Sequence, residues 1–216
     1  MKIGIVGGTG DIGEGMSLRL SQNHDVILGS READKAVTTS ECTMNELRRR
    51  GKPCSCRGVC NQDAVDAGDV IILAIPFKHL ASTLGSLRGF ENKIVVSPVN
   101  PMEKKDFFTF VPPPEGSAAL MVKKILPQSA RICTAFNTIA ANRWKALDEE
   151  LEVAVPVCSD DAGAKLVVME IVRTISHLQA FDAGPLDVSP MVESLTPLLL
   201  NIARYNKMKD VGVLFR

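Results

Sequence analysis

A glycine-rich turn near the start of the chain constrains the fold more than any other feature. Residues 2–6 are a short apolar run typical of a buried strand, and the sequence continues Gly7-Gly8-Thr9-Gly10-Asp11-Ile12-Gly13. This segment contains the pattern G-x-G-x-x-G between a predicted strand and a predicted helix. In that setting Gly8 permits a tight turn, Gly10 lets a pyrophosphate approach the backbone, and Gly13 lets the helix lie close to the strand. We therefore expect a dinucleotide site at residues 8–13, against the alternative of a glycine-rich turn that binds nothing.

Short runs rich in valine and isoleucine alternate with segments of helical period along the rest of the chain. Such alternation is typical of βαβ units that build a mostly parallel sheet. Continuous apolar runs such as residues 70–75 are expected where helices cover both faces of a strand. We predict an α/β, doubly wound fold of the Rossmann type, with strands at residues 2–6, 24–29, 70–75, 94–98, 131–136, 153–158 and 178–182.

Apolar stripes and capping residues predict several helices between these strands. One stripe consists of Ile12, Met16 and Leu20, and another of Val37, Met44 and Leu47. Each stripe can pack on the sheet. A further helix is predicted to begin near Ser117, and another after residues 159–161, whose short oxygen-bearing side chains can cap free N–H groups. Residues 107–116 include three consecutive prolines and are expected to form a loop.

The last long helix is expected to have Ser189 as its N-cap and Pro190 in its first turn, where a missing N–H has no cost. Pro197 removes a backbone hydrogen bond and is expected to kink or break this helix near Thr196. Leucine and isoleucine surround much of its circumference, at positions 195, 198, 199, 200 and 202. We therefore expect the helix to be buried, either within the monomer or against the second subunit of a homodimer.

The chain length leaves room for one large domain and a small addition. A second domain that encloses a substrate usually needs about 100 residues of its own. We expect a dinucleotide-binding domain over residues 1–150 and a small C-terminal α/β extension over residues 151–216, which completes the cofactor cleft and contributes the dimer contact.

Composition excludes several classes of protein. The chain has 25 Lys plus Arg against 25 Asp plus Glu in 216 residues, whereas proteins that bind nucleic acids carry clustered basic residues to neutralise phosphates. Its apolar runs are shorter than the roughly 20 residues of a membrane-spanning helix, and its start does not resemble a secretory signal. We expect a cytoplasmic protein without a nucleic-acid or membrane partner.

Six cysteines are read as free thiols in a reducing compartment rather than as a disulfide framework. Cys54, Cys56 and Cys60 are clustered, but their C-x-C-x3-C spacing lacks the C-x2-C pair and the nearby histidine of structural zinc sites. We therefore predict no metal site.

The end of the second predicted strand is expected to choose between NAD and NADP. A carboxylate there binds the ribose 2′-hydroxyl, whereas a basic residue accommodates a 2′-phosphate. The sequence reads Gly29-Ser30-Arg31-Glu32-Ala33-Asp34-Lys35. Ser30 can donate a hydrogen bond, Arg31 offers paired planar donors and Lys35 adds a positive charge, so the set suits a phosphate. NADP is predicted, although Glu32 could take the carboxylate role if Arg31 and Lys35 were only solvated surface charges.

Candidate acid–base groups are few in this sequence. His24 and His177 are expected to be structural, and His79 could face the cofactor but has no evident partner to tune its pKa. The chain shows no Ser-His-Asp order, H-E-x-x-H or P-loop pattern. Hydride transfer between two bound redox cofactors needs close stacking and exclusion of water more than a side-chain proton donor. We therefore predict no catalytic side chain.

Several segments together resemble a known family. They are residues 5–10, 29–31, 75–77 and 95–98, the stretch Asp182-Ala183-Gly184-Pro185-Leu186, and the stretch Val192-Glu193-Ser194-Leu195-Thr196-Pro197-Leu198. The last two are the most specific. Nearly end to end, the chain resembles the NADP-dependent oxidoreductases of the 8-hydroxy-5-deazaflavin coenzyme F420.

That resemblance implies a cytosolic homodimeric enzyme that exchanges a hydride between C5 of the deazaflavin and C4 of the nicotinamide. It implies pyrophosphate contacts from Thr9 to Ile12 and 2′-phosphate contacts from Ser30, Arg31 and Lys35. It also places five apolar residues along the adenine and nicotinamide ends of NADP: Phe77, Ala81, Met102, Ala141 and Val211. These five could instead be plain core residues.

Two other functions stay open at the level of sequence. The chain could be an NADP-dependent reductase of a small imine or carbonyl compound, or an NADP-binding module without catalytic activity. Asn137, Asn142 and Met102 depart from the family pattern, although the flexible thioether of Met102 can preserve contact with a ring.

Overall fold

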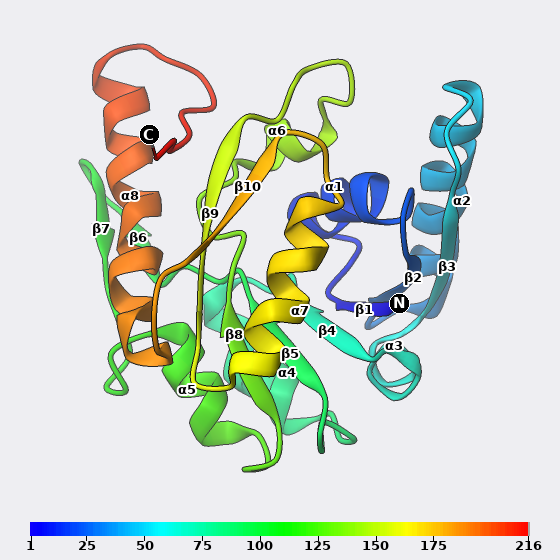
Figure 1. Cartoon of the computed structure of the whole chain (residues 1–216), viewed down its shortest axis with the longest axis horizontal. Coiled ribbons are helices and arrows are strands. Elements are labelled where there is room, and N and C mark those ends of the chain that lie inside the picture. The colour runs from blue at the N-terminus through cyan, green and yellow to red at the C-terminus, as the bar shows by residue number, and fades with distance from the viewer. Residues whose placement is uncertain (216) are drawn as a thin grey trace.

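One eight-stranded sheet forms the centre of the protein, and the computed structural model describes residues 1–215 (Figure 1). Its strands are β1 (Lys2–Val6), β2 (Asp25–Ser30), β3 (Ser55–Cys60), β4 (Val70–Leu73), β5 (Ile94–Ser97), β8 (Arg131–Thr134), β9 (Val153–Ser159) and β10 (Leu178–Asp182). They lie in the order β10-β9-β8-β5-β4-β1-β2-β3. Neighbouring strands are parallel, except that β9 runs antiparallel to β8. The predicted doubly wound, mostly parallel α/β fold is confirmed.

The chain reverses its path across the sheet between β1 and β4. From β1 it moves outward through β2 to β3, and then returns to β4 on the other side of β1. In open parallel sheets, ligands bind at the carboxyl ends of the strands beside such a switch point. The glycine-rich turn follows β1 directly and therefore lies at this point.

Helices cover both faces of the sheet, so its central strands are buried on both sides. One face is covered by α1 (Asp11–Leu20), α2 (Ala33–Arg49), α6 (Ala141–Lys145) and α7 (Ala162–Arg173). The other is covered by α3 (Asn61–Ala67), α4 (Phe77–Gly85), α5 (Ala118–Ile125) and the 3₁₀ turn η1 (Leu186–Val188). Alternate residues of β1 serve the two cores, since Ile3 and Ile5 join the first and Val6 the second. This double burial explains the uninterrupted apolar runs of the central strands.

All seven predicted strands are present, with ends that differ by at most two residues, but several elements were not predicted. The strand β3 was not predicted because its sequence, Ser-Cys-Arg-Gly-Val-Cys, has few β-branched or aromatic side chains. Gly58 is required there, since a Cβ at Gly58 would lie 2.0 Å from the Ala36 carbonyl carbon of α2. The helices α3, α4 and α6 were also missed. In addition, Phe108–Phe110 forms the strand β7 within a region that we expected to be loop throughout.

The buried stripe of α2 is shifted from the predicted one. Its buried residues are Ala36, Ser40, Thr43 and Leu47, whereas Val37 is 42% exposed. Including Val37 was therefore wrong. Small and hydroxyl-bearing side chains face the sheet because α2 lies very close to β3 at Gly58.

The last helix, α8 (Ser189–Tyr205), differs from the prediction in two ways. Its N-cap is Val188, not Ser189, whose hydroxyl instead lies 2.7 Å from the hydroxyl of Ser117. Pro197 lies inside the helix, which continues to Tyr205, so of the predicted kink or break near Thr196 the break does not occur. The helix stands at one side of the sheet beside the antiparallel hairpin of β6 (Met102–Lys104) and β7 (Figure 1). Asn201 joins the two by bonding both the N–H and the carbonyl oxygen of Phe108, at 2.8 and 2.7 Å.

A buried carboxylate connects α8 to α5. Glu193 is completely buried, and its two oxygens accept hydrogen bonds from the N–H groups of Ala118 and Ala119, at 2.7 and 3.0 Å. These are the first residues of α5, so Glu193 supplies acceptors that a helix N-terminus lacks. Burial raises the pKa of Glu193 to about 7, and the two N–H donors oppose this rise more weakly.

This raised pKa predicts a specific pH dependence of stability. Because the carboxyl group keeps its proton to higher pH in the folded state than in the unfolded state, its contribution to stability is complete below pH 4.5 and is lost as the pH rises through 7. The loss amounts to about 3 kcal/mol, at about 1.4 kcal/mol for each tenfold change in acid dissociation. Urea titrations from pH 4.5 to 8 should show this decline, and Glu193→Gln should remove it. The exposed Glu41→Gln serves as the control, and an identical pH profile in Glu193→Gln would contradict the assignment.

The sheet continues across residue 150, the boundary expected between the two parts of the chain. The strands β9 and β10 extend the same sheet beyond β8, and α7 covers them on one face. Within residues 1–215, no helix has both the length and the apolar character needed to cross a bilayer.

Candidate cofactor-binding site

The glycine-rich turn is held by three neighbouring elements. Gly7 adopts a φ of +76°, which favours glycine, and its N–H donates to Oδ1 of Asn61 at 3.1 Å. The N–H of Gly8 donates to the carbonyl oxygen of Gly29 at the end of β2, at 2.7 Å. The backbone is therefore fixed before a ligand arrives. Asn61, at the start of α3, was not singled out in the sequence because an isolated asparagine carries no recognisable pattern.

The three glycines of the motif have different structural roles. A Cβ on Gly13 would lie 2.5 Å from the Gly8 Cα, and a Cβ on Gly8 would lie 2.5 Å from Cγ of Leu28. These two glycines therefore permit close packing between the turn, α1 and β2. At Gly10, by contrast, the nearest neighbour of a Cβ would be the Gly7 carbonyl oxygen at 3.6 Å, an ordinary contact.

The start of α1 provides a site for an anion. The first intrahelical bond runs from the Glu14 N–H to the Gly10 carbonyl oxygen at 2.9 Å, so the N–H groups of residues 11–13 have no partner within the helix. Together with the positive end of the helix dipole, such groups favour a phosphate. Thr9, Gly10 and Ile12 lie around this point, and Gly10 borders both cavities described below.

A polar cavity of about 550 Å³ lies between the turn, the end of β2 and the face of α4. One wall carries Thr9, Ser30, Arg31, Glu32 and Lys35, which brings the predicted 2′-phosphate residues together. The hydroxyls of Thr9 and Ser30 are 3.3 Å apart, and Lys35 Nζ lies 2.7 Å from Oε1 of Glu32. Because the ammonium group of Lys35 has three donors, this exposed pair leaves it able to bind a phosphate as well.

The opposite wall of the polar cavity was not predicted. It consists of residues at helical spacing, namely Lys78, His79, Ser82 and Thr83 of α4 and its C-cap residue Ser86. This run of hydroxyl and basic residues was the signal that could have identified the wall, had α4 been recognised as a helix. His79 is exposed in the first turn of α4.

A second, apolar cavity of about 560 Å³ adjoins the polar one along the carboxyl ends of β4, β5 and β8. Gly10, Ala74, Ile75 and Pro76 border both, so the two cavities form one continuous cleft. The apolar part is lined mainly by side chains suited to flat rings, among them Ile12, Phe77, Val99, Met102, Ile139, Ala141 and Leu200. Its size falls within the range of cofactor sites, about 300–1,000 Å³.

Of the predicted site residues, most lie on this cleft. Gly8 and Gly13 are buried beneath the turn, whereas Thr9, Gly10, Asp11 and Ile12 border the cavities. Phe77, Met102 and Ala141 line the apolar part. Ala81 is exposed on α4 and Val211 is half-buried, and neither is among the lining residues.

The polar floor of the apolar cavity ties three separate segments together. Asn137 donates from Nδ2 to Oδ1 of Asn100 at 3.1 Å, while Asn100 donates to the carbonyl oxygen of Asn137 at 3.0 Å. Thr196 of α8 donates to the same carbonyl oxygen at 2.7 Å. The loops after β5 and β8 are thereby locked to α8. All three residues lie too far apart in sequence for a local pattern to reveal them.

Phe136, which precedes Asn137, has an unusual backbone conformation. Phe136 is buried and has a φ of +67°, which is rare for a bulky side chain. Its ring packs edge-on against Trp144 of α6, with the centroids 5.6 Å apart. Backbone strain of this kind tends to cluster at functional sites, and Phe136 lines the apolar cavity.

The helix α6 forms one edge of the cleft and packs closely against α1. A Cβ on Gly15 would lie 2.3 Å from the Trp144 Cβ, so the two helices are in close contact. The nearly buried guanidinium of Arg19 donates to three carbonyl oxygens at the end of α6, those of Arg143, Trp144 and Ala146, at 2.6–3.0 Å. Those oxygens are the acceptors that a helix C-terminus leaves unpaired.

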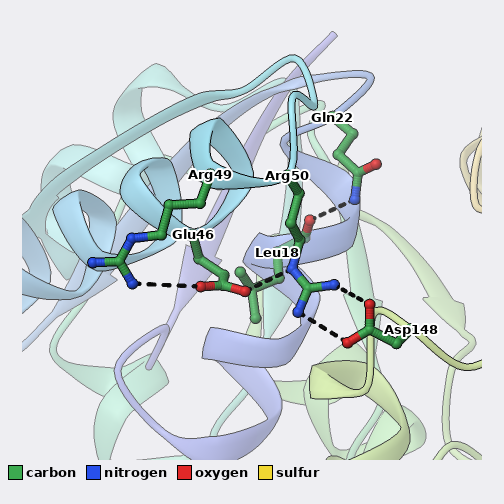
Figure 2. A network of polar contacts seen from close by, with 6 residues as sticks. All are labelled: Leu18, Gln22, Glu46, Arg49, Arg50 and Asp148. Carbon is green, nitrogen blue, oxygen red and sulfur yellow. Dashed lines mark hydrogen bonds and ion pairs between the residues drawn. The ribbon is translucent and has the colours of Figure 1, made fainter.

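A surface network joins the end of α2 to the loop after α6 (Figure 2). Figure 2 shows Arg50, just after α2, placed between Glu46 and Asp148. Its Nε lies 2.6 Å from Oε1 of Glu46, and its two terminal nitrogens bond both carboxylate oxygens of Asp148. The loop that follows α6 is thus tied to α2, which begins beside the polar cavity.

The buried cysteines and His24 are not among the residues that line the cleft, whereas His79 borders its polar part. Burial raises the pKa of Cys56 to about 12 and of Cys133 and Cys158 to about 11, which makes these thiols unreactive. His24 is buried and bonds the hydroxyl of Thr174 at 2.9 Å, as expected of a structural residue. Within residues 1–215, only Glu150, Glu152 and His177 come close enough together to share an ion, and all three are exposed.

The fold and the cleft define a Rossmann-type dinucleotide-binding protein. Its first strand-to-helix turn carries the G-x-G-x-x-G glycines, and the cleft opens at the carboxyl edge of the sheet.

Comparison with known proteins places the chain within this class. Residues 2–101 match the family described as NADP oxidoreductase, coenzyme F420-dependent. The chain is 36% identical over 219 residues to the F420-dependent NADP reductase of Methanocaldococcus jannaschii, covering 99% of this chain and 97% of that protein. It is 32% identical over 220 residues to the enzyme of the same name from Methanothermobacter thermautotrophicus, covering 99% and 94%. The chain therefore belongs to the F420-dependent NADP reductase family.

A solved structure agrees in fold. It is that of an Arthrobacter protein provisionally named an F420-dependent NADP reductase, with a TM-score of 0.81 over 100% of this chain and 99% of that chain. The sequence identity is 19%, so this likeness concerns the fold alone.

Proposed function

We propose that this protein is an enzyme that transfers a hydride between NADP(H) and coenzyme F420. The observation that carries this proposal is membership of the family, which rests on 36% and 32% sequence identity over 99% of the chain. The cleft supports it independently, because a polar cavity with basic residues continues into an apolar cavity that suits flat rings.

The cleft suggests how the protein serves this reaction. We infer that the turn and the start of α1 bind the pyrophosphate, and that Ser30, Arg31 and Lys35 bind the 2′-phosphate. The nicotinamide then lies in the apolar part beside Phe77, Met102 and Ala141, next to the deazaflavin. In the direction of F420 reduction, C4 of NADPH gives a hydride to C5 of the deazaflavin, which also takes up one proton. The protein's part is to orient the rings and exclude water.

The C-terminal segment is proposed to complete this cleft. Thr196, Leu200 and Asp210 border the apolar cavity, although the strands around the turn come from the first half of the chain. We infer that residues 151–216 act as the extension expected from the sequence. A cytoplasmic location is part of the same proposal, since all six cysteines are free thiols.

One spectrophotometric experiment tests the proposed reaction. Purified protein is mixed with NADPH and oxidised F420, and the loss of deazaflavin absorbance is followed. Bleaching that depends on the protein is expected. NADPH oxidation by a small imine or carbonyl compound without F420 would favour the rival reductase. NADPH binding without turnover of any acceptor would favour a non-catalytic module and contradict the proposal.

We further propose that the enzyme is a homodimer that forms through α8. Four large side chains form an exposed stripe on this helix: Met191 (72%), Leu198 (54%), Ile202 (37%) and Tyr205 (69%). Their spacing of seven, four and three residues places them on one face. The rest of its circumference buries Ser189, Val192, Glu193, Pro197 and Leu199. An exposed stripe that runs most of a helix typically marks an interface.

Leu198→Glu is expected to convert the homodimer into a monomer, because a charge at the centre of an apolar interface cannot be solvated. Analytical ultracentrifugation of wild type and variant measures the change. Leu166→Glu is the matched control, since Leu166 is 61% exposed on α7. A monomeric wild type, or a dimer unaffected by Leu198→Glu, would contradict this interface.

A further inference from the structure

A single lysine connects the edge of the cleft to the start of α1. Nζ of Lys145, the last residue of α6, lies 2.8 Å from Oδ1 of Asp11 and 2.8 Å from Oε2 of Glu14. Asp11 is the first residue of α1 and borders the apolar cavity beside Gly10. Its side chain is 81% exposed, whereas that of Lys145 is 35% exposed.

The position of Asp11 creates an electrostatic conflict. The start of α1 favours a negative charge, and a carboxylate and a pyrophosphate both suit it. Two anions at one helix end repel each other, with a strength that depends on local solvation. An unpaired Asp11 carboxylate would therefore weaken binding of the cofactor. Glu14 lies in the same first turn but borders neither part of the cleft.

The Lys145 ammonium group is placed to remove this conflict. Its hydrogen bonds to Asp11 and Glu14 raise the pKa of Lys145, so it is a cation throughout the neutral range. The same ion pair lowers the pKa of Asp11, so that carboxylate stays ionised. With both groups charged, the lysine holds the Asp11 carboxylate and offsets its charge.

The backbone of α6 makes this arrangement rigid. A Cβ on Gly15 would lie 3.4 Å from Cγ of Lys145, so the lysine stem lies against α1. Arg19 binds the carbonyl oxygens at the end of the same helix. Ala141 and Asn142, also on α6, border the apolar cavity. One short helix thus contributes to both the ring cavity and the anion site.

We propose that Lys145 is a positioning residue for the cofactor pyrophosphate, which holds the Asp11 carboxylate and cancels its charge at the turn where the pyrophosphate binds. This inference rests on the proposed function, since it assumes that NADP occupies the cleft. It assigns to α6 a role in affinity for the dinucleotide that is separate from recognition of the 2′-phosphate.

The test compares two ligands and three variants. NADPH has the pyrophosphate, whereas adenosine 2′-monophosphate carries the 2′-phosphate without it, and both affinities are measured by calorimetry. Lys145→Met removes the charge and keeps the stem against Gly15. Glu14→Gln is the matched control, because it removes the other partner of Lys145 and leaves the pair with Asp11. The double variant Asp11→Asn/Lys145→Met removes the repelling carboxylate as well.

Lys145→Met is expected to weaken NADPH binding about tenfold, equivalent to about 1.4 kcal/mol, and to leave adenosine 2′-monophosphate binding unchanged. Glu14→Gln should stay within about twofold of wild type, as is usual for a partly exposed ion pair. Adding Asp11→Asn should restore NADPH affinity to within about threefold of wild type, because coupled neighbours are not additive. The loss in Lys145→Met should also shrink at high salt.

Equal weakening of both ligands by Lys145→Met would indicate a general structural role and overturn the inference. Failure of Asp11→Asn to restore NADPH affinity would do the same. Unfolding midpoints of each variant show that the fold is retained. Turnover of F420 tests the proposed function separately, since the comparison of affinities needs only the two nucleotides.

Discussion

Gly10→Ala is expected to abolish tight NADPH binding while leaving the fold intact. Gly10 has a φ of −87°, which any residue can adopt. A Cβ there would lie 3.6 Å from its nearest neighbour, the Gly7 carbonyl oxygen. Nothing in the packing therefore requires glycine at this position. The remaining reason for glycine is the close approach of the pyrophosphate to the backbone.

The contrast with Gly13→Ala separates binding from folding. A Cβ on Gly13 would lie 2.5–2.7 Å from three backbone atoms of Gly8, and backbone atoms cannot move aside cheaply. We expect Gly13→Ala to lower the free energy of unfolding by about 3 kcal/mol. Gly10→Ala should lower it by at most about 1 kcal/mol, because alanine is a poorer N-cap than glycine.

Affinity and stability are measured on the same preparations. The Kd for NADPH should rise about 100-fold in Gly10→Ala, which corresponds to about 2.7 kcal/mol. Urea titration gives the stability of both variants. NADPH affinity close to that of wild type in Gly10→Ala would show that the pyrophosphate does not pass over this glycine, and the placement of the cofactor would be wrong.

Replacing both Arg31 and Lys35 with alanine is expected to remove the preference for NADP over NAD. Both side chains border the polar cavity beside Ser30, at the end of β2. Hydrogen bonds to a charged phosphate contribute about 1.5–3 kcal/mol each. Lys35 already pairs with Glu32, but both side chains are more than 60% exposed, at 64% and 62%, so the pair is weak and competes little with a phosphate.

The Kd for NADPH should rise about 100-fold in the Arg31→Ala/Lys35→Ala variant, or about 2.7 kcal/mol, while the Kd for NADH should change little. Arg49→Ala is the control, because Arg49 lies at the far end of α2 and is 80% exposed. Equal losses for both nucleotides would show that these residues do not recognise the 2′-phosphate. A large change in the Kd for NADH, without a change in the Kd for NADPH, would point to Glu32 as the residue that binds the ribose.

Local sequence patterns predicted the sheet well and the helices unevenly. Strands such as Val70–Leu73 were evident because double burial leaves only apolar residues. The strand β3 was not predicted because it contains Gly58, a residue unusual in strands, which is needed for the close contact with Ala36. The helix α4 was not predicted because its polar residues face the cleft and interrupt the apolar pattern of a helix. In both cases a tertiary contact, rather than local preference, explains the residue types.

The same division applies to the candidate site. The glycine motif and the Ser30-Arg31 pair could be recognised because their residues are neighbours in sequence, and we propose that each set binds one part of the dinucleotide. The wall formed by α4, the Asn100–Asn137 pair and the contact of Lys145 with Asp11 could not. Asp11 and Lys145 are 134 positions apart, and only the packing of α1 on α6 through Gly15 brings them together.

The amino-acid order was sufficient for the α/β class and the glycine-rich turn, because both depend on short-range periodicity or on residues close along the chain. It was sufficient for the family because segments along nearly the whole chain resemble it. The continuous cleft, the hydrogen-bonded residues Asn100, Asn137 and Thr196 that line it, and the ion pair of Asp11 with Lys145 depend on helices and loops from distant segments. The geometry of these features depends on how closely two backbones can approach each other and on which buried hydrogen-bond donors lie next to acceptors. Both are determined only when the sheet and its helices have assembled.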